Sequence, residues 1–485
     1  MLPVPIVRRV SVLAMAALMT GCSLVPTYQR PAAPLALDWA TPQTAGASRP
    51  VAVADRWWTT FNSPELTRLE DGALTGNFDL QAAVARLREA EATATIAGAA
   101  LYPSVDLAIT SERKTSLQVQ LNNSAVLEPT YEADLWGKNR ATADSATALA
   151  HATQFDAQTA ALTLTGAVAN TYINALSLQA RVKLAQTIAN DAAQILKLIQ
   201  AQSSLGAASQ LEVEQQRNAV ATFDAAVVTL QQQFEQSLHS LAVLVGVSPS
   251  GFKLGANNLD GLEVPTVASS KPSDVIVQRP DIRAAEARLI SANFDIGAAR
   301  AALLPDISIT ATFGLTNQNH GKILGPLALP DLMTSLLQPV FAGGALRGQL
   351  NLDRAHAEEL IATYRQSIEL AYQDVEDALS AAARLEALGR IDGVAVDSAR
   401  RASSLADAQY RLGATDFLTF LTTERTLYQA EDALLQVRAL RLQAAVALFQ
   451  AFGGGIDTNA ALQQTMTAPI PADPLALTRQ NPSSE

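Results

Sequence analysis

Residues that could catalyse a reaction or hold a metal ion do not gather in this 485-residue chain. Its four histidines are scattered and make no metal-ligand spacing: His151, His239, His320 and His356. No segment resembles a phosphate-binding Walker loop or a nucleophile elbow. The triplet Gly453-Gly454-Gly455 has the wrong spacing for a dinucleotide loop and fits a helix C-terminus better. The sequence therefore predicts no enzyme, no cofactor and no metal site.

The one cysteine, Cys22, stands where a processing site is expected. A single cysteine can form neither an internal disulfide nor a zinc cluster. Ahead of it lie the basic pair Arg8-Arg9, the apolar run Val10–Met19 and the small residues Thr20-Gly21. This order is typical of a secretory signal peptide, which we place at residues 1–21.

A cysteine directly after the cleavage position resembles a bacterial lipobox. The resemblance implies that Cys22 is acylated and anchors the mature N-terminus to a membrane through acyl chains. Ser23 at the next position resembles sorting to the outer membrane. The alternative is an ordinary signal peptide followed by a free cysteine.

Composition narrows the class of protein further. Charged residues make up only 17% of the chain, and the formal net charge is −11 with no block of Lys or Arg, which disfavours a nucleic-acid surface. Beyond the N-terminus no run of 18 apolar residues occurs, so we expect no transmembrane helix in the mature chain.

The sequence contains an internal repeat, in which the same order of elements occurs twice. Asp79 matches Asp281 at an offset of 202 positions, and the run from Ala99 to Pro103 matches the run from Ala301 to Pro305. A long repeat of this kind sets the organisation of the whole chain. Each copy reads as a helix, a proline break and a strand.

The strand of each copy alternates between apolar and polar residues. In the second copy, Ile307 to Leu315 places apolar residues at every other position, with Ser, Thr and Gly between them. Ser104–Glu112 is the corresponding strand of the first copy. Such alternation is typical of a membrane barrel strand, and the alternative is a half-buried strand in a soluble sheet. One strand alone does not decide between them.

Return strands are expected at Thr130–Trp136 in the first copy and at Met333–Phe341 in the second. A further alternating piece, Leu117–Leu121, belongs either to the first return strand or to the loop before it.

Two long helical tracts follow the return strands. Proline is absent from Thr130 to Ser248 and from Val340 to Ala468, and each tract breaks once, at Ser204–Ser209 and Arg411–Asp416. Each tract is therefore expected to form a hairpin of two helices, the first beginning with a helix of roughly 65 residues, about 100 Å long. Apolar residues at spacings of four and seven favour packing along a helical seam: Leu184, Ile188, Ile195 and Ile199.

Four strands per chain cannot close a barrel, because small barrels start at eight strands. An open sheet edge in lipid would leave backbone groups without hydrogen-bond partners. If these strands enter a membrane, several chains must share one barrel, and a trimer supplies twelve strands.

The chain resembles the TolC-like outer-membrane factors of tripartite efflux systems, in the lipoprotein branch often called NodT-like. The motifs that carry the resemblance stand in order over nearly the whole chain: Gly21-Cys22, Tyr28–Pro31, Trp57-Trp58, Phe61, Pro64, Leu66, Asn77–Leu80, Asp134–Gly137, Arg279–Ile282, Ala285-Glu286, Gly297–Ala301, Pro305, Gln338–Phe341, Gly343-Gly344, Tyr410, Gly413, Asp416 and Leu418.

This resemblance implies an α+β membrane protein built from two tandem repeats. Each chain of a homotrimer would give four β-strands to a shared 12-stranded outer-membrane barrel and long helical hairpins to a periplasmic α-barrel. A periplasmic adaptor and an inner-membrane pump, of the RND type by resemblance, would complete a path for small toxic compounds or drugs. An exit duct of a type I protein-secretion system is the alternative, because it shares the fold.

The domain layout follows from the repeat. We expect a signal peptide at 1–21, a lipidated tether at 22–54, a first repeat at 55–250, a link at 251–272, a second repeat at 273–455 and a disordered C-terminal tail at 456–485. The protein would be lipid-anchored in the outer membrane with a long periplasmic extension.

Two sets of site residues lie at the predicted hairpin ends. Tyr410, Arg411 and Asp416 are candidates for a constriction, because three copies of Asp416 around one axis would form a ring of like charge. Alternatively, Asp416 caps the returning helix. A set of Leu-Gly pairs is expected to dock the adaptor, or else Gly permits the turn and Leu packs beneath it: Leu205, Gly206, Leu412 and Gly413.

Overall fold

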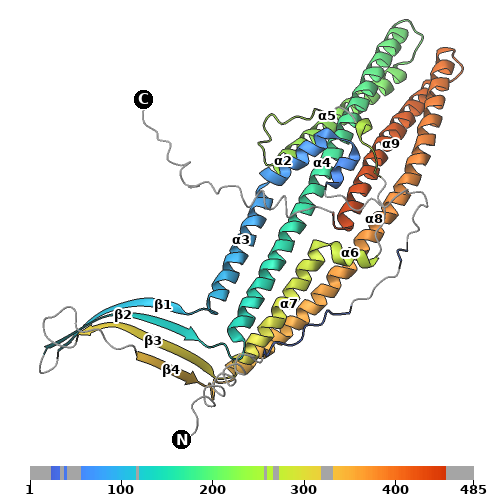
Figure 1. Cartoon of the computed structure of the whole chain (residues 1–485). Coiled ribbons are helices and arrows are strands. Elements are labelled where there is room, and N and C mark those ends of the chain that lie inside the picture. Colours follow the sequence, from blue (N-terminus) through green and yellow to red (C-terminus); the bar gives the residue numbers. More distant parts are fainter. Residues whose placement is uncertain are drawn as a thin grey trace, which may run out of the picture. The chain divides into compact units, whose positions relative to one another are not determined.

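The computed structural model describes residues 23–32, 38–40, 56–115, 119–255, 259–265, 272–317 and 331–454. These residues divide into two compact units. Unit 1 comprises Ala85–Asp156 and Asp281–Ser367 with the N-terminal segment; unit 2 comprises Pro34–Val84, Ala157–Pro280 and the chain from Ile368 onward. Several long helices run through both units, so each unit is described by itself (Figure 1).

The duplication predicted from the sequence is confirmed element by element. Helices α3 (Phe78–Ala99) and α7 (Pro280–Ala301) both have 22 residues and begin 202 positions apart. Strands β1 (Ser104–Thr115) and β3 (Asp306–Asn317) keep the same offset. Helices α4 (Lys138–Ser204) and α8 (Ala345–Arg411) both have 67 residues and begin 207 positions apart. The second copy therefore carries five extra residues between its outgoing strand and its long helix.

Unit 1 contains a four-stranded antiparallel sheet in the order β1-β2-β3-β4 (Figure 1). The return strand of the first copy, β2, runs from Val119 to Glu132. The predicted return strand Thr130–Trp136 is thus wrong, and part of the alternating piece Leu117–Leu121 belongs to β2. Residues 116–118 lie outside the described part of the chain.

Pro129 explains the misplaced strand. It directly precedes the predicted strand Thr130–Trp136, but it lies inside β2 opposite Val105 of β1. A proline cannot donate its backbone nitrogen to a ladder. Consistently, the pairing of β2 with β3 resumes at Thr130 after Leu127 and skips Glu128 and Pro129. The strand continues through the proline because its other side remains paired.

The second return strand, like the first, ends earlier than predicted. Strand β4 covers Asp331–Leu337, so the last part of the predicted strand Met333–Phe341 lies beyond it. Gln338 holds this following segment, because its side-chain amide donates to the carbonyl oxygens of Leu303 and Pro339 at 3.2 and 3.0 Å. Gly343 and Gly344 then turn the chain into α8 with φ of 59° and 89°.

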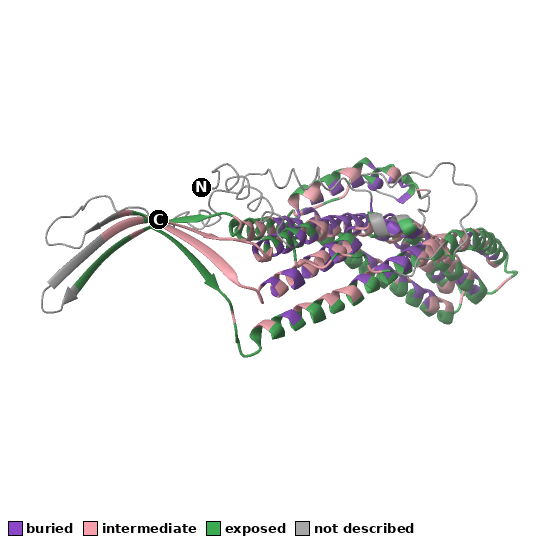
Figure 2. Cartoon of the chain, turned by 60° about the horizontal axis from the view of Figure 1, so that its bottom comes forward, coloured by how far each residue is buried: buried purple, intermediate pink, exposed green. Residues whose placement is uncertain are grey.

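One face of the sheet is apolar across all four strands. Leu107 pairs with Leu127, and Leu127 pairs with Phe313, so their side chains share a face. All three are exposed in the single chain, and Figure 2 shows the strands coloured exposed and intermediate without a buried layer. The opposite face carries polar residues such as Thr310 and Ser335. The alternation predicted for a membrane strand is confirmed, because no residue that the structure describes covers this apolar face.

Unit 2 has its core around the short helix η1 (Trp57–Phe61). Both tryptophans are buried, and Trp57 stacks on Phe449 with ring centroids 5.2 Å apart. The helices that contribute to this core include α4, α2 (Pro64–Gly76), α5 (Gln210–Val245) and α9 (Phe417–Ala451), together with η2 (Leu259–Gly261). The interpretation of Trp57 and Trp58 as buried rings is therefore confirmed.

Each repeat closes on itself through the same joint. The Asn77 amide donates to the carbonyl oxygen of Leu244 at 2.9 Å, where α5 ends. Arg279, between α6 (Pro272–Gln278) and α7, donates to the carbonyl oxygen of Ala451 at 3.3 Å, where α9 ends. Leu244 and Ala451 are 207 positions apart, so the joints are equivalent. Both satisfy carbonyl groups that a helix end leaves free.

A second core lies where the long helices approach their hairpin ends. It contains Ile199 from α4, Phe223 from α5 and Phe420 from α9, with Ile188 and Ile195 packed against it. Three of the four predicted seam residues thus contribute to interhelical packing. Within the described part of the chain, no helix is both long and apolar enough to cross a membrane.

Glu70 on α2 generates the first prediction. It is fully buried, and neither of its carboxylate oxygens has a hydrogen-bond partner within the described residues. Burial, assisted by the charge of Asp71, raises its pKa well above the ordinary 4.5. When the pH exceeds the pKa that this carboxyl group has in the unfolded chain, the group ionises in the unfolded chain but stays protonated in the folded one. The free energy of unfolding therefore falls as the pH rises.

Replacing Glu70 by Gln should therefore raise the thermal unfolding midpoint at pH 7.5 and leave it nearly unchanged at pH 4.5. The measurement is thermal unfolding of the detergent-solubilised protein at both pH values. Glu235→Gln, on the exposed side of α5, serves as the control and should shift neither midpoint. A difference between Glu70→Gln and the unchanged protein that is equally large at both pH values would contradict the explanation.

Candidate functional site

The two hairpin ends in unit 2 have the same backbone geometry. In the first, the N–H of Ala207 donates to Gln202 O at 2.8 Å and the N–H of Gly206 donates to Ser203 O at 3.0 Å. In the second, Ala414 and Gly413 repeat these bonds at 2.8 and 3.0 Å to the residues 207 positions further along. This pair of bonds defines a Schellman motif, which ends a helix with a left-handed residue.

The glycines meet the requirement of this motif. Gly206 has φ of 78° and Gly413 has φ of 71°, values that favour glycine over other residues. A Cβ added at either position would meet no atom within 4 Å. The interpretation that Gly permits the turn is therefore confirmed, and the surrounding space is open.

The leucines before these glycines project into solvent. Leu205 is 84% exposed and Leu412 is 83% exposed, so the alternative that they pack beneath the turn is wrong. Leu211 and Leu418, one turn into the returning helices, are also exposed. Large apolar side chains at the tips of both hairpins form a surface suited to a protein partner. Their role in docking stays a prediction.

Asp416 is the N-cap of α9. Its Oδ1 accepts the backbone N–H of Thr419 at 2.7 Å, and this hydrogen bond lowers the pKa of the carboxyl group. The capping interpretation is therefore confirmed. The side chain remains exposed, so a further role in a charged ring stays open. The first hairpin uses Ser209 in the same position, with Glu212 completing a capping box.

The other two predicted constriction residues have different surroundings. Tyr410 packs in an aromatic cluster, stacked on Phe420 at 5.5 Å and tilted against Phe417 at 5.6 Å. Burial, together with the charge of Glu212, raises the pKa of the Tyr410 hydroxyl. Arg411 is exposed and pairs with Asp407 at 2.9 Å. Tyr410 thus stiffens the second hairpin end, whereas Arg411 and Asp416 present their charges to solvent.

The predicted lipid attachment residue, Cys22, lies outside the described residues, but the segment after it is well defined. Residues 23–32 are extended and lie along α7 in unit 1. The Leu24 and Pro26 carbonyl oxygens accept from Arg300 at 3.3 Å and Asn293 at 2.8 Å. A Cβ added at Gly137, just before α4, would lie 3.9 Å from the Cα of Ser23. Ser23 therefore lies where strand β2 gives way to helix α4.

Glu286 fixes the other end of this segment. Its carboxylate accepts two hydrogen bonds from Arg30, both at 2.6 Å, and one from the Tyr28 hydroxyl at 3.4 Å. Charge-assisted bidentate pairs of this kind are strong and directional. Burial is the main cause of a raised pKa at the Tyr28 hydroxyl, and the Glu286 carboxylate adds to it. Sequence reasoning quoted Glu286 only as part of a motif and missed its contact with the distant residues 28 and 30.

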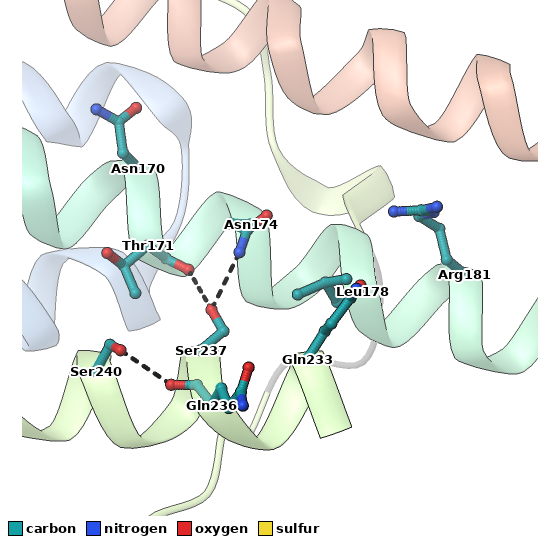
Figure 3. A pocket seen from close by; sticks show the side chains of 9 residues that line it. All are labelled: Asn170, Thr171, Asn174, Leu178, Arg181, Gln233, Gln236, Ser237 and Ser240. Carbon is teal, nitrogen blue, oxygen red and sulfur yellow. Dashed lines mark hydrogen bonds between the residues drawn. The ribbon is translucent and has the colours of Figure 1, made fainter. Parts of the chain in front are cut away.

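A polar groove lies between α4 and α5. It encloses about 520 Å³. Figure 3 shows the amide of Asn174 directed at Ser237, at 3.4 Å, and Ser237 bonded to Thr171 O at 3.3 Å. The charged Arg181 is bound to Asp432 by two hydrogen bonds of 2.6 and 3.1 Å. These groups join helices and do not pair a nucleophile with a base.

No group of three or more potential metal ligands occurs within the described residues. His151 and His239 are exposed on α4 and α5, and His356 lies 3.3 Å from Glu359. His320 lies outside the described residues. The features that stand out are therefore the uncovered apolar sheet face and the hairpin ends, and neither is arranged as a catalytic centre.

Comparison with known families shows which family combines such a sheet with such helical hairpins. The family described as outer membrane efflux protein matches residues 69–247 and 272–454, once for each repeat. The chain belongs to the outer membrane efflux protein family. The two matched stretches cover well over half of the chain and include both hairpins.

Relatives with a stated role support the same placement. The pyoverdine export outer membrane protein OpmQ of Pseudomonas putida is 38% identical over 428 residues, which cover 85% of this chain and 91% of that protein. The toluene efflux pump outer membrane protein TtgC of Pseudomonas putida is 31% identical over 451 residues, covering 90% and 93%.

Solved structures agree in fold. A membrane protein from Pseudomonas aeruginosa superimposes with a TM-score of 0.83 at 30% identity, covering 90% of this chain and 98% of its own. The open state of the Neisseria gonorrhoeae MtrE outer membrane channel gives a TM-score of 0.81 at 26% identity, covering 90% and 99%. The chain thus has the TolC-like fold and is an outer-membrane channel component of an efflux system, as predicted.

Proposed function

We propose that three copies of this chain form one channel through which a tripartite efflux system exports small toxic compounds or drugs. The observation that carries this proposal is the four-stranded sheet, whose apolar face and two edges no described strand or helix covers. In lipid, unpaired backbone groups cost on the order of several kcal/mol each. Pairing β4 of one copy with β1 of the next removes both edges and gives twelve strands.

The implied partners are a periplasmic adaptor and an inner-membrane pump, for which we favour the RND class by family resemblance. The exported compound would be a small molecule rather than a protein. Names of the relatives favour this over type I protein secretion, because they refer to pyoverdine export and toluene efflux. No catalytic step is proposed for the chain itself, since its family is a channel component.

We also propose that Cys22 is acylated after removal of residues 1–21 and that the lipid sits at the periplasmic rim of the barrel. The position of Ser23 beside Gly137 supports this, because Gly137 lies between β2 and α4. The domain layout given above, with a lipidated tether, two repeats and a C-terminal tail, is part of the same proposal.

Acylation can be tested by growing cells with radiolabelled palmitate. The label should be incorporated into the unchanged protein and not into the Cys22→Ser variant.

The main test is dye accumulation in energised cells that lack the gene and in cells in which it is restored. Deletion should raise the retained dye, and restoration should lower it to the starting level, because the dye then regains its exit. A chain carrying Cys22→Ser can be included to separate anchoring from conduction. Retention that does not change on deletion, for several dyes and for toluene, would argue against small-molecule efflux.

Asp416 tests the proposed constriction. Its side chain both caps α9 and carries charge, so Asp416→Asn should keep the cap and remove only the charge, whereas Asp416→Ala removes both. If a ring of Asp416 charges, with Tyr410 and Arg411 nearby, forms the constriction, both variants should change single-channel conductance in planar bilayers. Conductance that changes in Asp416→Ala alone would assign the effect to the cap.

Leu205 and Leu412 test the proposed docking surface, which also includes Gly206 and Gly413. Because the leucines are exposed and the glycines hold the left-handed turn, Leu205→Asp and Leu412→Asp should weaken adaptor binding without disturbing the turn. Co-purification of the adaptor and dye efflux should both fall, while channel conductance stays unchanged. Leu388→Asp, exposed on α8 away from the tip, is the matched control. Undiminished adaptor recovery from the double variant would contradict docking at this surface.

A further inference from the structure

The sheet leaves large side chains uncovered at both edges, at the ends of the strands nearest the helices. Beyond the edge strand β4, Val340 is 93% exposed and Phe341 is 90% exposed. Before the other edge strand, β1, Tyr102 is 73% exposed, and Val105 within that strand is also exposed. All four residues belong to unit 1. Exposed apolar groups flanking an open backbone edge indicate a surface that another chain covers.

Inside the chain, the junction of the two repeats shows how such a surface is covered. The segment that follows β2 is bound to the segment that begins β3. Ala133 donates its N–H to the carbonyl oxygen of Ile307 at 2.8 Å, and the Trp136 ring nitrogen donates to Pro305 O at 2.8 Å. Lys138 completes this junction with ion pairs to Glu132 and Asp306 at 2.8 and 3.1 Å.

Because the two repeats correspond residue by residue, the pairing at this junction predicts how the open edges of two copies pair. Strand β3 corresponds to β1 at an offset of 202, and the segment after β2 corresponds to the segment after β4 at an offset of 207. The left-handed glycines Gly137 and Gly344, with φ of 73° and 89°, mark this second correspondence. Ala133 opposite Ile307 therefore becomes Val340 opposite Val105, and Phe341 falls beside Ser104, near Tyr102.

An independent feature supports this register. It places Leu336 of β4 opposite Ile109 of β1, and both belong to the apolar face of the sheet. A slip of one residue would put Leu336 opposite a residue of the polar face, because side chains alternate along a strand. The transferred register thus keeps the apolar face continuous from one copy to the next.

We propose that Val340 and Phe341 of one copy clasp Val105 and Tyr102 of a second copy of this chain, sealing the barrel rim at each contact between chains. The partner surface is part of the same interface as the paired edges β4 and β1. This rests on the proposed trimer and adds the residues and register that join its chains.

The clasp differs in chemistry from the junction inside the chain. There, Asp134 caps α4 by accepting the N–H groups of Asn139 and Arg140 at 3.1 and 2.7 Å, and Lys138 joins two carboxylates. The equivalent positions of the second repeat hold Phe341 and Ala345. The contact between copies is accordingly apolar, so it gains free energy by removing exposed side chains from water when chains meet.

The test is oxidative crosslinking of the full chain in outer membranes with the paired substitutions Val105→Cys and Val340→Cys. Opposed positions of antiparallel strands lie within disulfide range. The pair should give bands of linked chains on denaturing gels, and neither single variant should. Ala133→Cys with Ile307→Cys is the matched control inside one chain, and Ile109→Cys with Val340→Cys should not link.

Absence of linked chains from the Val105–Val340 pair, while the protein still runs as a trimer and exports dye, would overturn the clasp and leave the proposed function intact. If the unchanged protein neither forms a trimer nor exports dye, the proposed function fails, and the clasp fails with it.

A second measurement addresses the aromatic side chain. Phe341→Ala should lower the temperature at which the trimer band dissociates on a gel, because it removes a buried intersubunit ring. Phe313→Ala, on the apolar face of the inner strand β3, should leave that temperature unchanged. Equal behaviour of the two variants would count against the role of Phe341.

Discussion

Backbone hydrogen bonding at the edges of the sheet is the constraint on which the rest of the structure depends. Among the described strands, β1 and β4 each pair with only one other strand, and the face between them is apolar. Water could satisfy the edges but not the face, whereas lipid could cover the face but not satisfy the edges. Only further strands in lipid meet both requirements. On this argument the four described strands need further copies of the chain to complete a barrel. The rest of the fold must therefore leave β1 and β4 accessible to neighbouring copies.

The duplication makes such an assembly simple to build. Each repeat contains an outgoing strand, a returning strand and a hairpin of long helices, closed by an equivalent joint at Asn77 and at Arg279. The tightness of that joint is clearest at Gly246, where a Cβ would lie 2.0 Å from the carbonyl oxygen of Gly76. Both joints therefore fix the start of α3 or α7 against the end of the second helix of the hairpin in the same repeat.

Much of this could be predicted from the sequence because the signals were local or repeated. Helical tracts without proline, the Leu-Gly-Ala breaks and the matching offsets located both hairpins to within a residue or two. The capping role of Asp416 followed from its type and position. These features depend on backbone conformation within a few residues, which residue type largely determines.

The features that escaped prediction depend on contacts distant in sequence. Pro129 continues a strand only because β1 pairs with its other side, and no local signal reveals that partner. Arg30 and Glu286 lie 256 positions apart, so their ion pair has no signature in a single sequence. The exposure of Leu205 and Leu412 agrees with the docking hypothesis, although leucine type alone favours burial.

Differences between the two repeats carry the functional information, since their shared features already account for the fold. The first hairpin end is closed by Ser209 and Glu212, whereas the second adds an aromatic cluster at Tyr410 and a charged cap at Asp416. The first strand junction is polar, with Asp134 and Lys138, whereas the second is apolar at Phe341.

A chain with identical repeats would make identical contacts within and between copies, and it could close into rings of varying size. Making the junction between chains chemically distinct from the junction within a chain separates the two kinds of contact. The apolar junction stays open until another copy arrives, while the polar junction is satisfied inside each chain as it folds. On this reasoning the Phe341 side chain, which is exposed in the single chain, contributes to the assembled channel.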